Sequence, residues 1–437
     1  MPTLEGISVE QKALEMNLDS GKYGTIAEIG GGQETARWFF RVGGASGSVA
    51  KTVSAYDMQV SDAIYGCSPR YVSEQRISTM LDHEYDLLLS RLTKSRGAKS
   101  TFFAFANTAA VRSYRWRKDG NGWLGIQFQT KANGPAHRII LHAGLRGSET
   151  ADQQETLGVL GVNLIYGAMF LHAEPEALVD SLFDHLSLSH AEIDFIRFEG
   201  PAFSKIGNRR MNLRLVHSGL AEAVAFTAKG RPIEPNSLLR NRALLTLRGS
   251  FNPVTNTHVR ILEASLSRFR QEFSLKEEEV IAAPEISLHN LKSSDRFSSK
   301  DYLHRLTTLA RLGYPVLVTN FPEFYRLADY LSRHTDREIA FATGIKLLQN
   351  IFEEKYYEGL KGGILEAFGR MFTNRVRLYA YLGEGQHAGD LSTVNKLPVA
   401  PHLRHLYQHL IRNHFIRAVR PKKISGTQKL SLQIHRN

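Results

Sequence analysis

Residues 243–258 have the sequence ALLTLRGSFNPVTNTH, and this stretch decides the fold of the C-terminal half. Ala243 to Arg248 is a mostly apolar run before a glycine, as expected for a buried parallel strand. Gly249 to Asn256 is expected to be a loop. Apolar residues then recur at helical spacing, at Val259, Leu262, Leu266 and Phe269. A strand, a glycine turn and an amphipathic helix in this order predict the first βα unit of a doubly wound sheet.

The same turn has the features of a phosphate-binding site. Gly249 lets the backbone approach a ligand closely, and Pro253 stiffens the turn. The helix that begins past Thr255 presents unpaired N–H groups and the positive end of its dipole. His258 falls in the first turn of that helix, where its ring could reach a phosphate oxygen. The segment therefore predicts a site for a nucleotide phosphate.

Strands and helices continue to alternate after this segment. The expected strands are 314–319, 338–343 and 376–382, and the expected helices include 302–312 and 324–334. This alternation predicts a Rossmann-like, doubly wound α/β domain over residues 242–437. Lys and Arg crowd the end of this domain, which we expect to be a solvated basic tail.

The turn resembles the head motif of the nucleotidylyltransferase superfamily, and most of all that of the nicotinamide mononucleotide (NMN) adenylyltransferases. Every fixed position of their Gly-Ser-Phe-x-Pro-x-Thr-x-x-His pattern is present, from Gly249 to His258. The resemblance implies transfer of AMP from ATP to a mononucleotide phosphate, with release of pyrophosphate. It implies catalytic roles for His258 and Thr255, and ATP contacts near Gly249, Ser250 and Phe251. Mg²⁺ would be carried on the ATP phosphates and not in a protein cage.

Three later segments extend this resemblance. Residues 341–348, FATGIKLL, are similar to the family's Gly-x-Asp-x-Leu segment, and residues 424–427, ISGT, to its Ile-Ser-Ser-Thr phosphate-binding turn. Residues 290–292, NLK, stand where the family carries a lysine that touches phosphates. The resemblance implies further nucleotide contacts, at Gly344, Lys292, Ser425 and Thr427.

Two departures from the family pattern support a different hypothesis. Lys346 stands at the family's Asp, and Leu430 stands at an Arg of the phosphate-binding turn. An acid replaced by a base changes the local charge by two units. The alternative to an adenylyltransferase is therefore a catalytically silent nucleotide-binding scaffold, or a subunit of a complex.

The N-terminal block predicts a layered α/β domain over residues 1–172. Its expected strands are 24–28, 51–56, 101–106, 124–129 and 137–142, and its main helices are 34–40, 73–92 and 153–170. A small α+β bridging module follows over residues 173–241. It has an expected helix at 175–186 and expected strands at 193–198, 211–216 and 222–226.

The N-terminal block resembles the CinA C-terminal amidase domain, which deamidates NMN. Residues 42–46, VGGAS, and 53–56, VSAY, are similar to that family's loop and following strand. Ile29 stands where the family has its nucleophilic serine, and an alkyl side chain cannot attack an amide. We therefore expect no amidase activity by the usual route. Two alternatives stay open: a Ser/Lys/Tyr set from the residues Ser46, Ser48, Lys51 and Tyr56, and nucleotide binding by the glycine run 30–32.

The composition limits the class of protein and of partner. Of 437 residues, 42% are hydrophobic, which excludes a disordered chain. Lys plus Arg number 55 and Asp plus Glu 43, giving a formal net charge of +12. This charge suits a nucleotide, an acidic protein or, as a third hypothesis that rests on the basic tail, a nucleic acid. A homo-oligomer or a larger complex stays open.

The single cysteine and the lack of apolar runs bear on location. Cys67 alone excludes an internal disulfide and a zinc site built on several thiolates, which predicts a reducing compartment, either the cytoplasm or an organelle matrix. No apolar run approaches the roughly 20 residues of a membrane span. Residues 1–20 carry acids and lack the apolar core of a secretory signal. No histidine grouping predicts a metal site.

Overall fold

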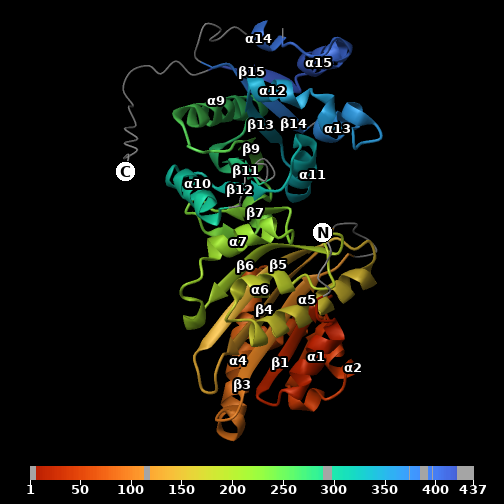
Figure 1. Ribbon diagram of the computed structural model, residues 1–437, viewed down its shortest axis with the longest axis vertical. Coiled ribbons are helices and arrows are strands. Elements are labelled where there is room, and N and C mark those ends of the chain that lie inside the picture. The colour runs from red at the N-terminus through yellow and green to blue at the C-terminus, as the bar shows by residue number, and fades with distance from the viewer. Residues whose placement is uncertain are drawn as a thin grey trace. The chain divides into compact units, whose positions relative to one another are not determined.

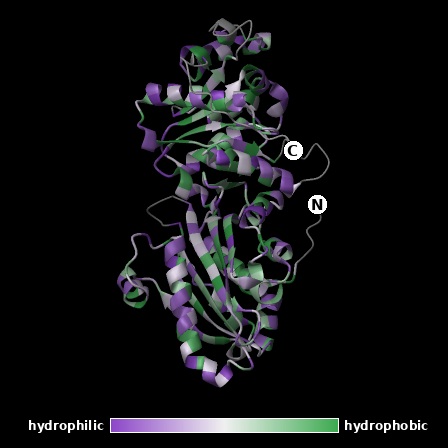
Figure 2. Cartoon of the chain, turned by 90° about the vertical axis from the view of Figure 1, so that its left-hand side faces the viewer, coloured by the Kyte–Doolittle hydropathy of each residue, from purple (hydrophilic) through white to green (hydrophobic). Residues whose placement is uncertain are grey.

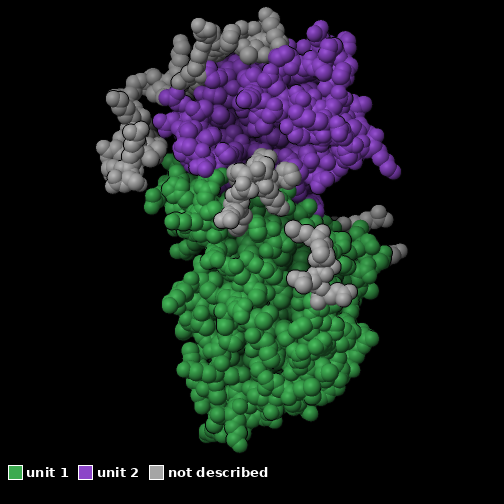
Figure 3. Space-filling view, viewed as in Figure 1, with its two compact units in different colours: residues 1–238, 287–320 green, residues 239–286, 321–437 purple. Residues whose placement is uncertain are grey.

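The computed structural model describes residues 6–112, 119–288, 298–373, 375–383, 392–395 and 397–420. The chain divides into two compact units (Figure 3). Unit 1 comprises residues 1–238 and 287–320, and unit 2 comprises residues 239–286 and 321–437. The segment 287–320 therefore belongs to unit 1, although in the sequence it separates the two parts of unit 2.

Unit 1 is built on a six-stranded mixed sheet with the order β2-β1-β3-β4-β5-β6. The strands are β1 (Lys22–Gly30), β2 (Val49–Ala55), β3 (Thr101–Ala110), β4 (Gly120–Gln129), β5 (Ala136–Leu145) and β6 (Ala191–Glu199). The first three are parallel, and the rest are joined antiparallel. Almost every residue of β3 and β4 is buried, because helices cover this part of the sheet.

Six helices of the described residues belong to the same part of unit 1 as this sheet. They are α1 (Val9–Leu18), α2 (Thr35–Arg41), α3 (Met58–Tyr65), α4 (Glu74–Arg96), α5 (Thr150–Phe170) and α6 (Pro175–Ser181). The apolar stripe of α4, at Ile77, Leu81 and Leu88, is buried as its spacing predicts. Helix α5 is buried along most of its length. Figure 2 shows hydrophobic residues along the strands and hydrophilic ones on the outer faces of helices.

A second, smaller sheet of unit 1 includes β7 (Ala223–Phe226), β8 (Pro232–Ile233) and β12 (Val316–Thr319). Strand β12 pairs antiparallel with β7, and β7 with β8. Helices α7 (Asn208–His217) and α10 (Ser299–Arg311) accompany this sheet. The sequence alternation assigned 302–312 and 314–319 to the doubly wound domain, but both segments lie in unit 1.

The prediction of a strand over 211–216 is wrong, because these residues lie within α7. Met211, Leu213 and Leu215 alternate with other residues, which imitates a strand. The helix is buried on more than one side, against β6 and β7, so the apolar residues do not mark a single stripe.

Unit 2 is a doubly wound α/β sheet, as predicted. All five strands are parallel, with the order β10-β9-β13-β14-β15. They are β9 (Ala243–Leu247), β10 (Val280–Ala282), β13 (Ile339–Gly344), β14 (Val376–Tyr381) and β15 (Ile416–Val419). The chain adds β10 on one side of β9 and β13 on the other, so the strand order reverses between β9 and β13. This is the topological switch point of the sheet.

The helices of unit 2 connect these strands (Figure 1). They are α9 (Asn256–Phe273), α11 (Phe324–His334), α12 (Ile345–Ile351), α13 (Gly363–Met371), α14 (Ser392–Asn395) and α15 (Arg404–Arg412). Two further elements, α8 (Pro235–Leu239) and β11 (Glu285–Ser287), contain two of the three points where the chain passes between the units. Over the described ranges, no helix is both long and apolar enough to cross a membrane.

Candidate functional site

A buried ion pair anchors the start of the predicted phosphate-binding turn. The Arg248 guanidinium donates to both carboxylate oxygens of Glu285, at 2.7 and 3.1 Å, and to the Pro322 carbonyl at 2.9 Å. Both charged side chains are buried. The Gly249 N–H also donates to the Glu285 carbonyl at 3.1 Å. The turn therefore leaves β9 in a fixed direction.

Within the turn, Phe251 packs inward and shapes the site. Its φ is +50° and its side chain is 1% exposed. A Cβ at Gly249 would lie 3.1 Å from the Phe251 ring, tighter than ordinary contact, so glycine leaves the room that this ring needs. The Phe251 ring also lies 4.9 Å from the His258 ring, centroid to centroid. Ser250, next to Phe251 in the turn, is exposed.

Thr255 and His258 form a reciprocal cap at the start of α9. The Thr255 N–H donates to His258 Nδ1 at 3.0 Å, and the Thr255 hydroxyl lies 3.0 Å from the same nitrogen. Because Nδ1 accepts from a backbone N–H, a neutral His258 carries its proton on Nε2. Burial lowers the pKa of His258 and favours this neutral form. His258 is thus held as a neutral ring with one N–H donor available.

The switch point brings a second predicted residue to the same edge. Leu247 of β9 pairs with Ala342 of β13, and the strands are parallel, so their carboxyl ends are adjacent. Gly344 ends β13 two residues after this pair and caps α12. Gly249 and Gly344 therefore follow neighbouring strand ends, where open α/β sheets bind ligands.

The predicted site residues divide into two groups. Gly249, Ser250, Phe251, Thr255 and His258 share one turn, and Gly344 follows the neighbouring strand. Three others lie outside the described residues: Lys292, Ser425 and Thr427. Lys346, at the family's Asp position, is exposed on α12. Among residues that the structure describes, no group of three or more His, Cys, Asp or Glu could hold a metal ion.

The glycine run of the N-terminal block leads to a helix start that is already occupied. The Glu28 carboxylate accepts from the N–H groups of Thr35 and Ala36 at 2.9 and 3.1 Å, and from the Asn107 amide at 3.1 Å. Burial raises the pKa of Glu28. Because this carboxylate takes the place of an incoming anion, the run 30–32 is not a phosphate site of the expected kind.

Ile29, at the position of the amidase serine, is a core residue. It is buried in one cluster with Ala27, Ala55 and Tyr65. Its side chain has no nucleophilic atom, so this position supplies no amidase chemistry.

The proposed Ser/Lys/Tyr set does not assemble. The Ser48 hydroxyl is buried and donates to Asn17 Oδ1 at 2.5 Å, whereas Tyr56 is 78% exposed. Lys51 Nζ forms an ion pair with a carboxylate oxygen of Glu84 at 2.6 Å. In the described ranges, no hydrogen bond or ion pair links Ser46 with Lys51 or Tyr56.

Glu84 is a buried acid beside Lys51 that sequence analysis missed. Besides pairing with Lys51, it accepts from the Tyr65 hydroxyl at 2.8 Å. Burial and the Glu84 carboxylate raise the pKa of Tyr65, so this hydroxyl remains a donor. The available signal was an acid on the apolar face of α4, three residues after Leu81 and four before Leu88.

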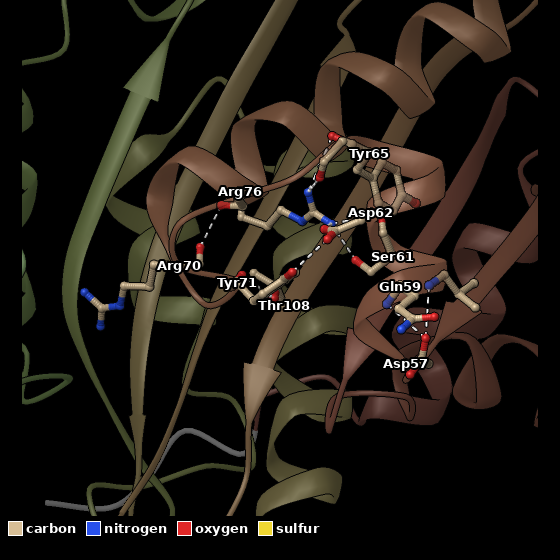
Figure 4. Close-up of polar contacts among 12 residues, drawn as sticks. Asp57, Gln59, Ser61, Asp62, Tyr65, Arg70, Tyr71, Arg76 and Thr108 are labelled. Atoms are coloured by element: carbon tan, nitrogen blue, oxygen red, sulfur yellow. Dashed lines mark hydrogen bonds and ion pairs between the residues drawn. The ribbon is translucent and has the colours of Figure 1, made fainter.

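Close to this cluster, Arg76 organises the connection between α3 and α4 (Figure 4). Its buried guanidinium donates to the carbonyls of Ser61 and Gly66 and to the Ser61 hydroxyl. Tyr71 in the same connection donates to Asp62 at 2.8 Å. These polar groups form hydrogen bonds with one another and with the local backbone. Their role is therefore to hold the connection between α3 and α4 in place.

Comparison with known proteins adds three partial likenesses. No family model matches the sequence, and no curated protein matches it. Competence/damage inducible protein CihA from Agrobacterium tumefaciens shares 19% identity at a TM-score of 0.24, over 35% of this chain and 88% of that chain. A competence-damaged protein (CinA) superfamily protein from Enterobacter cloacae shares 16% identity at a TM-score of 0.27, over 37% of this chain and 92% of its own. A competence or damage-inducible protein from Enterobacter asburiae shares 13% identity at a TM-score of 0.26, over 37% of this chain and 95% of its own.

Proposed function

We propose that unit 2 binds ATP and transfers AMP to the phosphate of a mononucleotide, as an adenylyltransferase of the NMN type. The observation that carries the proposal is the position of the Gly249–His258 turn. It follows the first strand of an all-parallel sheet, at the switch point, and leads into an 18-residue helix. The acceptor nucleotide is NMN, nicotinate mononucleotide or a related phosphate.

The turn supplies donors for the charge on ATP. His258 Nε2–H donates to a phosphate oxygen, and Thr255 holds the ring in the tautomer that allows this. The N–H groups of Asn256 and Thr257 begin α9 and find no acceptor among the described residues. They add the positive end of the helix dipole to the same place.

These groups act by positioning and charge stabilisation. The mononucleotide phosphate attacks the α-phosphorus of ATP in line, a P–O bond forms, and the bond to the leaving pyrophosphate breaks. The protein holds both reactants and stabilises the charge that develops. Mg²⁺ would be carried on the ATP phosphates as part of the substrate.

The test is pyrophosphate release from ATP and Mg²⁺ with NMN or nicotinate mononucleotide. The full chain is compared with His258→Ala and with His409→Ala, which removes an exposed histidine on α15 of the same unit. We expect turnover in the unchanged protein and in His409→Ala, and a loss of about 10²-fold or more in His258→Ala. Turnover that survives His258→Ala would contradict the proposal.

A second candidate is a catalytically silent nucleotide-binding scaffold. Lys346 favours it, because this exposed cation stands where the family resemblance places an acid. ATP binding that His258→Ala weakens, without turnover for any mononucleotide, would support the scaffold. Restored turnover in Lys346→Asp would then identify the change that silenced the site.

A further inference from the structure

A cavity of about 600 Å³ is lined by residues of unit 1, none of which belongs to the proposed nucleotide site. Four arginines line it: Arg197, Arg209, Arg210 and Arg231. The rest of its wall includes the apolar residues Phe195, Pro232 and Leu303. These residues come from β6, the start of α7, the turn between β7 and β8, the first residue of β8, and α10. Helix α7 contacts β6, β8 and α10, and Figure 1 shows α7 near β6 and α10. We call this the arginine cavity.

Two of its arginines are neutralised and two are not. Arg197 pairs with Glu74 and Glu199, and Arg210 pairs with Glu176. Arg209 donates only to neutral acceptors, the Thr307 hydroxyl at 3.2 Å and the Lys229 carbonyl at 3.5 Å. For Arg209 and Arg231, no carboxylate oxygen of the described chain lies within 4.0 Å. The cavity thus holds two unneutralised guanidinium groups.

The start of α7 adds backbone donors to the same cavity. Gly207 caps this ten-residue helix and has no side chain to accept a hydrogen bond. The Asn208 side chain is used elsewhere, because it bonds the N–H and the carbonyl of Phe198 on β6. Within the described part of the chain, nothing accepts from the N–H groups of Asn208, Arg209 and Arg210.

The start of α7 and the Arg209 side chain are held in place by other parts of unit 1. Asn212, one helical turn after Asn208, bonds the N–H and the carbonyl of Ile196, so two side chains tie α7 to β6. Gly230 has φ +69°, and a Cβ there would lie 3.0 Å from Arg209 Nη2. Glycine therefore lets the Arg209 guanidinium lie against the turn. A site whose donors are already ordered loses less entropy on binding.

We propose that the arginine cavity binds a small organic phosphate. The phosphate group is held by Arg209, Arg231 and the N–H groups that begin α7, because guanidinium forks and helix starts both match phosphate oxygens. The organic part lies against Phe195, Pro232 and Leu303. The cavity volume falls within the roughly 300–1,000 Å³ of small-molecule sites, and is larger than a phosphate ion needs. This inference does not depend on the proposed adenylyl transfer.

The test uses adenosine 5′-monophosphate (AMP) and inorganic pyrophosphate as probes, titrated calorimetrically into the full chain. The His258→Ala variant is used throughout, because this change weakens phosphate binding at the proposed site of unit 2. We expect Arg209→Gln/Arg231→Gln to weaken AMP binding by at least about tenfold. The control Arg37→Gln/Arg91→Gln removes the same charge from exposed helix positions of unit 1 and should change the affinity by less than about twofold.

A further variant separates ligand loss from misfolding. Gly207→Asp places a carboxylate at the helix N-cap, which favours α7 but occupies the phosphate position. We expect it to keep or raise the melting temperature and to abolish AMP binding. Unchanged AMP affinity in Gly207→Asp or in Arg209→Gln/Arg231→Gln would overturn the proposal. So would no binding of either probe up to about 10 mM, or binding of single-stranded RNA through these residues without binding of AMP.

Discussion

Replacing Glu285 by Gln should loosen the turn of unit 2 through the loss of one buried charge. The carboxylate accepts two hydrogen bonds from Arg248, and both side chains are almost fully buried. Gln keeps the shape and one acceptor, but it leaves the guanidinium with the Pro322 carbonyl and no counter-ion. Losing one hydrogen bond to a charged group costs about 1.5–3 kcal/mol, and breaking a buried pair about 3–5 kcal/mol. We expect a loss of about 3 kcal/mol.

Hydrogen exchange of the full chain measures this loss locally. About 3 kcal/mol corresponds to roughly a 10²-fold fall in protection, which we expect in peptides that cover β9 and the start of α9. The control Glu263→Gln changes an exposed carboxylate of α9 and should cost less than about 0.5 kcal/mol. Protection of the turn that is the same in Glu285→Gln and in Glu263→Gln would refute the argument that this ion pair fixes the turn.

Three further predictions follow from other buried groups. The His258 ring should titrate by NMR below the ordinary value of about 6.5, because burial lowers its pKa; a higher value would contradict the capped, neutral ring. Ile29→Ser should lower the free energy of unfolding by about 2–4 kcal/mol in denaturant melts without producing NMN amidase activity, since it replaces a core side chain by a buried hydroxyl. Burial raises the pKa of Glu192 to about 7, so the native state binds more protons than the unfolded state between pH 4.5 and 7. The melting temperature should therefore fall more with rising pH in the unchanged protein than in Glu192→Gln. Equal slopes of melting temperature against pH in the two proteins would exclude Glu192 as the cause of the fall.

The strand, turn and helix of residues 243–273 could be predicted because neighbours in sequence determine them. The apolar run, Gly249 and the spacing of Val259, Leu262 and Phe269 each act within a few residues. The structure has β9 and α9 where these signals indicate. The class of the domain followed from the same kind of signal, since strands and helices alternate along the chain.

Strand partners could not be predicted from such local signals. The run 314–319 has the composition of a buried strand in either sheet, and its alternation with helices suggested the parallel one. It pairs with β7 instead, almost 100 residues earlier in the chain. For α7, burial on more than one side removed the single apolar stripe by which a helix is identified. In both cases tertiary packing decided the outcome.

The site shows the same division between near and distant contacts. Thr255 and His258 are three residues apart, so their contact could be expected from the motif. The pair Arg248–Glu285 joins residues 37 positions apart, and nothing near either residue indicates its partner. The arginine cavity collects side chains from residue 195 to residue 303, so only the folded chain brings them together.

The starts of helices α2, α9 and α7 differ in the charge of the groups that lie beside their N–H groups. This difference affects how strongly an anion can bind at each helix start. Helix α2 receives the Glu28 carboxylate from its own chain, so its partial charge is already balanced. Helix α9 is capped by two neutral side chains, Thr255 and His258, which form hydrogen bonds with one another but add no negative charge. Helix α7 begins with a glycine beside unneutralised arginines. An anion therefore gains least at α2 and most at α7, where binding would supply the charge that the fold itself leaves out.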